Sequence, residues 1–153
     1  WVEVDVKGSR IQLLNTHLAV DSRTRRCQLT GLLGEEWLGA ALGLGPVVLC
    51  GDFNCGPLSR EYSRRCELLV DSQVVQYVSP TSATWFSWTP LARIDHIHAT
   101  PDRQTIDAHV CRDRLARDAS DHLPLIAEIR IAMDGGDCSI FDPQRCEVLP
   151  ASG

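Results

Sequence analysis

No apolar run in this sequence reaches the ~18 residues that a membrane-spanning helix requires, and no charged-then-apolar leader opens the chain. These absences predict a soluble protein with no transmembrane segment. Methionine is also scarce, because Met133 is the only one. The chain opens directly with WVEVDV, a pattern typical of a strand already under way. The sequence therefore looks like a piece of a longer protein.

An excess of positive charge is missing as well. The 153 residues include 15 basic and 20 acidic side chains, which gives a net charge of −5. No basic stripe of the kind that binds nucleic-acid phosphates is visible. This weakens the hypothesis of a nuclease without excluding it, because a bound metal ion can supply positive charge locally.

The seven cysteines form no CxxC pair, and several lie inside apolar runs, where a reduced thiol behaves as a small hydrophobe. We interpret them as reduced, structural residues rather than as a zinc site or a disulfide framework, and this interpretation predicts a cytoplasmic protein. With 44% hydrophobic residues the chain is long enough to bury one core, so a single domain is expected.

Hydrophobic periodicity predicts a mixed α/β chain. Expected strands are a hairpin over 1–6 and 10–18, a strand over 46–51 covered on both faces, and strands over 93–100, 105–112 and 122–131. Apolar residues at three- and four-residue steps predict one helix from Ser22 to about Leu44, and a weaker helix is expected over 60–69. Periodicity is lost after Met133, so residues 1–132 are the expected domain and residues 133–153 a tail or linker.

Polar side chains recur where the expected strands end or begin. They are His17, Asp52, Asn54, Asp95, Asp121 and His122. Taken alone, each is more often a helix cap, a turn residue or a hydrogen-bonded bystander. Open α/β sheets gather strand ends at one rim, so together these residues predict a single cleft. Carboxylate and amide oxygens suit a cation such as Mg²⁺, and imidazoles transfer protons, which is the chemistry of phosphate-ester hydrolysis.

Four stretches resemble, in this order, the successive motifs of the endonuclease/exonuclease/phosphatase superfamily: NTHL at 15–18, GDFN at 51–54, RIDHI at 93–97 and SDHLPL at 120–125. The resemblance extends over about residues 1–131. It implies the carboxyl-terminal half of a DNase I-like fold, a four-layer α/β/β/α sandwich with mixed, largely antiparallel sheets. It also implies a phosphodiesterase or phosphatase that depends on Mg²⁺ or Mn²⁺ and hydrolyses its substrate with an activated water.

The resemblance assigns catalytic roles to five residues. Asp52 would orient or deprotonate the attacking water, and Asn54 would hydrogen-bond that water and the phosphate. His122 would contact the phosphate or transfer a proton, with Asp95 as its carboxylate partner. His17 matches a family histidine that stabilises the transition state or serves the leaving group.

Metal and substrate contacts are implied in the same way. Asp121 would bind the metal directly or through water, together with Asp52 and Asn54. Arg23 and Arg25 are candidates for substrate binding, although a solvated first helical turn also explains them.

The neighbours of these motifs have simpler explanations. His96 alternates with Asp95 along a strand and is therefore expected to point to the other face. Trp85, Phe86 and Trp88 could stack on a base or a lipid headgroup, but aromatic residues in such a loop more often pack against the core. The acidic composition favours small phosphodiesters and phospholipid or inositol headgroups over duplex DNA as the substrate. The alternative is a metal-dependent endonuclease or exonuclease acting on DNA or RNA.

Family members also have an amino-terminal half ahead of NTHL, which supplies an asparagine and a glutamate that binds the metal. Nothing precedes Trp1 here to supply them, and Glu3 belongs to the hairpin that leads into NTHL. An alternative hypothesis is therefore a catalytically silent remnant or binding module with an incomplete site. Metal affinity would distinguish the two hypotheses, since a working site binds Mg²⁺ or Mn²⁺.

Overall fold

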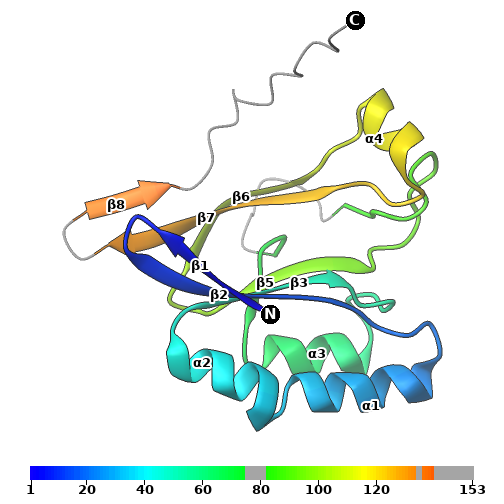
Figure 1. Ribbon diagram of the computed structural model, residues 1–153. Helices are drawn as coiled ribbons and strands as arrows, with labels where there is room; N and C mark the ends of the chain where they lie inside the picture. Colours follow the sequence, from blue (N-terminus) through cyan, green and yellow to red (C-terminus); the bar gives the residue numbers. More distant parts are fainter. Residues whose placement is uncertain (75–81, 134–135, 140–153) are drawn as a thin grey trace, which may run out of the picture.

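The computed structural model describes residues 1–74, 82–133 and 136–139 (Figure 1). Its strands are β1 (Val2–Val6), β2 (Ser9–His17), β3 (Val47–Asp52), β4 (Val70–Asp71), β5 (Asp95–Ala99), β6 (Gln104–Val110), β7 (Leu125–Met133) and β8 (Gly136–Ser139). Its helices are α1 (Ser22–Leu32), the π-helix η1 (Glu35–Gly39), α2 (Ala40–Leu44), α3 (Arg60–Cys66) and α4 (Arg114–Ala119).

These elements form stacked layers. A five-stranded sheet has the order β1-β2-β3-β5-β4, and a three-stranded sheet has the order β6-β7-β8. Helices α1, α2 and α3 cover one face of the larger sheet, and the smaller sheet lies over its other face (Figure 1). Strands β2 and β3 are parallel and the other described pairs are antiparallel. This confirms the carboxyl-terminal portion of an α/β/β/α sandwich with mixed, largely antiparallel sheets.

The hydrophobic core lies between the larger sheet and its helices. Leu14 of β2 and Leu49 of β3 meet Leu29 of α1 and Leu38 of η1 there, and Phe53 joins them from the loop after β3. Residues on β2 and β3 alternate, so the next positions along each strand face the other side of the sheet. The core therefore fixes which side chains of these strands lie on the opposite face.

The expected long helix is broken, which corrects the prediction of one helix from Ser22 to Leu44. It begins as predicted, because the Asp21 side chain caps α1 by accepting a hydrogen bond from the Thr24 amide at 2.7 Å. It ends near Gly34, whose backbone is extended with φ −78° and ψ 176°. Apolar spacing continues across this break, whereas glycine weakens the helix at that point.

Two further elements were not expected. Helix α4 starts at Asp113, whose side chain accepts a hydrogen bond from the Ala116 amide at 2.7 Å. Strand β8 pairs with β7, and Met133 is opposite Gly136. The expectation of no regular structure after Met133 is therefore wrong for residues 136–139, because backbone pairing needs no side-chain periodicity. Residues 140–153 lie outside the described part.

Two further findings concern membrane-spanning helices and the state of the cysteines. Within the described residues, no helix combines the length and the apolar character needed to cross a membrane. Cys27, Cys50, Cys55, Cys66 and Cys111 are free thiols. Free thiols agree with the interpretation of these cysteines as reduced structural residues.

Candidate active site

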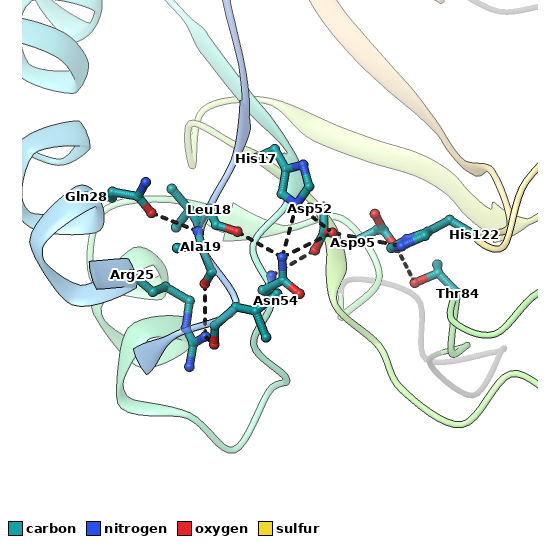
Figure 2. A network of polar contacts seen from close by, with 11 residues as sticks. His17, Leu18, Ala19, Arg25, Gln28, Asp52, Asn54, Thr84, Asp95 and His122 are labelled. Atoms are coloured by element: carbon teal, nitrogen blue, oxygen red, sulfur yellow. Dashed lines mark hydrogen bonds and ion pairs between the residues drawn. The ribbon is translucent and has the colours of Figure 1, made fainter. Parts of the chain in front are cut away.

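Strand register brings the motif residues into one row across the larger sheet. His17 at the end of β2 pairs with Asp52 at the end of β3, and Asp52 pairs in turn with Asp95 at the start of β5. His122 reaches the same place from the segment before β7, where its backbone bridges to Trp85. Figure 2 shows these side chains pointing toward one another. The predicted gathering of strand ends at one rim is therefore what the structure shows.

The close approach of β2 and β3 beside this row requires glycine at position 51. Gly51 has φ +138°, and a Cβ atom placed on it would lie 1.8 Å from the Thr16 carbonyl oxygen. That oxygen belongs to backbone, which cannot move aside. The glycine of GDFN is thus needed for the register that places His17 next to Asp52.

Asn54 is held by a dense set of contacts at the mouth of β3. Its backbone is left-handed with φ +50°, and its amide N–H donates to Asp52 Oδ1 at 2.8 Å. Its Nδ2 donates to the Leu18 carbonyl at 2.8 Å and lies 3.1 Å from His17 Nε2 and 3.3 Å from Asp52 Oδ2. A carbonyl only accepts, so the Leu18 contact identifies Nδ2. Asn54 Oδ1 is then the atom that can accept from a water or bind a cation.

His122 and Asp95 form a directed pair. His122 Nδ1 lies 2.8 Å from Asp95 Oδ2, and because a carboxylate accepts, Nδ1 carries the proton. The other ring nitrogen, Nε2, faces Asp52 Oδ2 at 3.9 Å. Burial lowers the pKa of His122, but the hydrogen bond to Asp95 and the charges of Asp95, Asp52 and Asp121 outweigh it, so the pKa lies above the ordinary 6.5.

Thr84 completes this pair and was missed by the sequence reasoning. Its hydroxyl donates to Asp95 Oδ2 at 2.5 Å, and its side chain is fully buried. Its backbone is fixed by hydrogen bonds with Ala92 and Leu123. The residue lies in a Ser/Thr-rich stretch, and nothing in the local pattern distinguishes this hydroxyl from its neighbours.

The donors at this site fit a divalent cation. Asp52, Asp95 and His122 each offer a ligand atom, and these atoms lie within 4.8 Å of one another. Carboxylate oxygens are the ligands that Mg²⁺ and Mn²⁺ prefer. Asp95 Oδ2 is already engaged with His122 and Thr84, and Asp52 Oδ1 accepts from the Asn54 amide. Asp121 is exposed and lies outside this group of three.

Arg23 and Arg25, the arginines predicted to bind substrate, both lie in the first turn of α1. Arg25 Nη1 donates to the Ala19 and Val20 carbonyls at 3.1 and 2.6 Å, so it fastens the loop after β2 (Figure 2). Arg23 is exposed on the first turn of α1. Gln28 supports the same loop by accepting a hydrogen bond from the Ala19 amide at 2.8 Å. The structure therefore gives Arg25 a role in holding the loop that follows His17.

A cleft of about 400 Å³ opens in front of the row. Its lining consists of His17, Asp52, Asn54 and His122 together with Val20, Trp85, Ala92 and Ile94. Of the three aromatic residues noted in the sequence, Trp85 lines this cleft, whereas Phe86 and Trp88 are 44% and 61% exposed. Four polar residues and four apolar residues thus line the cleft.

Comparison with known proteins agrees with this geometry. The sequence model of the Endonuclease/Exonuclease/phosphatase family matches residues 12–122, which is most of the chain. The chain belongs to the endonuclease/exonuclease/phosphatase family. No curated protein matches the sequence.

Several solved structures share the fold. A family member from Bacteroides vulgatus superposes with TM-score 0.71 at 20% identity, over 82% of this chain and 51% of its own. A mannosyl-6-phosphatase from Bacteroides thetaiotaomicron gives TM-score 0.60 at 21% identity, over 80% and 52%. The human nocturnin catalytic domain with bound sulfate gives 0.64 at 21% identity, over 80% and 48%. The chain thus spans about half the length of these relatives, and at such identities the match shows the fold alone.

Proposed function

We propose that this chain carries the catalytic half-site of a divalent-metal-dependent phosphoester hydrolase, a phosphodiesterase or phosphatase. The observation that carries the proposal is the row of Asp95, His122 and Asp52. Asp95 fixes the proton on His122 Nδ1, and the other ring nitrogen faces Asp52 Oδ2 at 3.9 Å. Asn54 is locked against the same carboxylate. This arrangement supports proton transfer around one bound phosphate.

Each residue has a role that its contacts support. Asp52 accepts a proton from the attacking water, and Asn54 Oδ1 orients that water. The imidazolium form of His122, which carries a proton on both ring nitrogens, donates from Nε2 to a phosphoryl oxygen, and Asp95 stabilises its positive charge. His17 is exposed at the cleft beside Asn54 and faces the leaving group. In-line attack on phosphorus needs positioning and charge neutralisation, so no covalent intermediate is required.

Asp52 and Asn54, with Asp121 at the outer rim, would hold Mg²⁺ or Mn²⁺. A bound cation supplies charge neutralisation at the phosphoryl oxygens.

The cleft favours a small phosphoester, including a phospholipid or inositol headgroup, as the substrate. Among the described residues that line it, none is a lysine or arginine, and the chain has a net charge of −5. Binding a nucleic-acid backbone relies on such cations at successive phosphates. The structural match to a mannosyl-6-phosphatase also supports a phosphomonoester. The alternative is a nuclease acting on DNA or RNA.

The free thiols support a reducing compartment such as the cytoplasm.

The test is metal-dependent hydrolysis of bis(4-nitrophenyl) phosphate, a diester, and of 4-nitrophenyl phosphate, a monoester, with Mg²⁺ and Mn²⁺ binding measured calorimetrically on the same samples. We expect hydrolysis that requires the metal and falls by about 10²–10⁴-fold in Asp52→Ala. The matched control is Asp118→Ala, which removes an exposed carboxylate on α4.

The comparison must also include a version of the protein extended ahead of Trp1. If only the extended protein hydrolyses the substrate, the result would support an active site to which this chain contributes part of the residues. Absence of metal-dependent hydrolysis in both versions would contradict the proposed function and favour the silent remnant or binding module.

A further inference from the structure

His96 lies on the opposite face of β5 from Asp95 and reaches the loop that carries Asn54. Its side chain is buried, with 1% of its surface exposed. Its Nε2 lies 2.9 Å from the carbonyl oxygen of Cys55, the residue after Asn54. Because a carbonyl oxygen only accepts, Nε2 must carry the proton and donate it.

The imidazole of His96 is fixed on its other sides as well. Its Nδ1 lies 3.5 Å from Asp71 Oδ2. Asp71 is itself held by the Arg93 guanidinium and by the Gln73 amide. The ring also packs against Phe53 and Tyr62, with centroids 5.9 and 5.3 Å away. The donor that faces Cys55 is therefore held by a network that solvent does not reach.

The backbone at this point needs such support. Asn54 has φ +50°, a left-handed conformation that a non-glycine residue adopts only at a free-energy cost. In this conformation Asn54 Nδ2 donates to the Leu18 carbonyl and lies 3.1 Å from His17 Nε2. The hydrogen bond from His96 holds the carbonyl of the Cys55–Gly56 peptide, the second peptide unit after the Asn54 α-carbon.

We propose that His96 is a positioning residue that holds the Cys55 carbonyl and thereby keeps Asn54 in its left-handed conformation against His17 and Leu18. The effect on catalysis rests on the proposed function, whereas the effect on Asn54 does not. Strand β5 then orients the site from both faces. Asp95 aligns His122 on one side, and His96 aligns the Asn54 loop on the other.

The matched variants are His96→Phe, which keeps a ring without a donor, and His96→Gln, which keeps an N–H donor. The primary readout is the side-chain amide NMR signal of Asn54, assigned with Asn54→Asp. We expect this signal and the Cys55 amide to shift in His96→Phe and to return toward wild type in His96→Gln. The Gln12 side-chain amide, bonded to Glu3 at 2.9 Å, is the internal control and should not move.

Activity measurements distinguish a positioning role of His96 from a role in filling the core. In the extended, active protein, kcat should fall about tenfold in His96→Phe with little change in KM, and His96→Gln should recover part of it. Hydrolysis absent in every version, with the Asn54 shift still present, would contradict the proposed function and leave the positioning role standing.

Two results would overturn the positioning role. One is an unchanged Asn54 signal in folded His96→Phe. The other is a set of ring ¹⁵N shifts of His96 in the wild-type chain that show Nε2 without a proton. This measurement needs no variant, so it applies even if His96→Phe fails to fold.

Discussion

The two faces of the larger sheet use the same residue types in opposite ways. On the cleft face, His122 pairs with Asp95, and its pKa is raised above 6.5 because the carboxylates outweigh partial burial. On the helix face, His98 is completely buried, and burial lowers its pKa to about 3 although Asp71 lies nearby. A histidine–carboxylate grouping can therefore exchange protons on one face and remain neutral on the other.

The difference lies in what surrounds each group. On the cleft face, His122 Nε2 and Asn54 Oδ1 face an open cleft, so they remain available to a substrate. On the helix face, Asp71 is enclosed by the Arg93 guanidinium and the histidine rings. Burial tends to raise its pKa, but the hydrogen bond with His96 and the Arg93 charge hold it below its usual range. The proposed function assigns chemistry to the first arrangement, and we propose stability and positioning as the role of the second.

The largest expected effect follows from removing the histidine of the cleft face. His122→Ala should lower kcat of the active protein by about 10²–10⁴-fold, because the donor to the phosphoryl oxygen is lost, with little change in the free energy of unfolding. His109→Ala is the matched control, since His109 pairs with Asp107 at 2.6 Å on exposed β6. Equal losses in both variants, or full activity of His122→Ala, would contradict the role of the cleft face.

A substitution on the helix face should mainly lower the free energy of unfolding. Asp71→Asn leaves the Arg93 guanidinium buried without its counter-charge, so the free energy of unfolding should fall by about 3–5 kcal/mol. Asp118→Asn, which removes an exposed ion pair with Arg114, should cost less than about 1 kcal/mol. Chemical denaturation measures the free energy of unfolding of both variants. A similarly small loss in both would show that the buried Asp71–Arg93 pair contributes no more to stability than the exposed pair does.

A smaller effect is expected at Thr84. Thr84→Val removes the hydroxyl that donates to Asp95 Oδ2 and should lower kcat by about tenfold without unfolding the protein. Thr84→Ser retains the hydroxyl and should restore most of the activity. Failure of serine to outperform valine would indicate that packing, rather than the hydrogen bond, matters at this position.

The last expected effect is the pH dependence that the two faces impose on stability. Because the pKa of His122 is raised on folding, its contribution is fully present below about pH 6.5 and is lost as the pH rises through the folded-state pKa. Because the pKa of His98 is lowered to about 3, the unfolded chain binds a proton that the folded chain does not. Stability should therefore fall as the pH drops from 6.5 toward 3.

NMR titration of the histidine rings checks both directions. We expect His122 to titrate above 6.5 and to move down in Asp95→Asn, and His98 to stay neutral through the accessible range. A His122 that titrates at or below 6.5 would contradict the coupling to Asp95.

Short-range pattern was enough to identify the family and to predict the residues of its candidate site. The NTHL, GDFN, RIDHI and SDHLPL stretches contain His17, Asp52, Asn54, Asp95 and His122. Alternation along a strand also predicted that His96 would face away from Asp95, and the structure places it there. These inferences succeed because side-chain direction and motif identity depend on neighbouring residues only.

Tertiary structure alone decided which of these residues touch and what supports them. The register that aligns His17 with Asp52 and Asp95 depends on pairing among three strands. The Thr84 hydroxyl and the Asp71 carboxylate acquire roles only through residues 11 and 22 positions away. Such contacts form when distant segments pack together, and the breaks and pairings that make them, such as the turn at Gly34, leave no periodic pattern in the sequence.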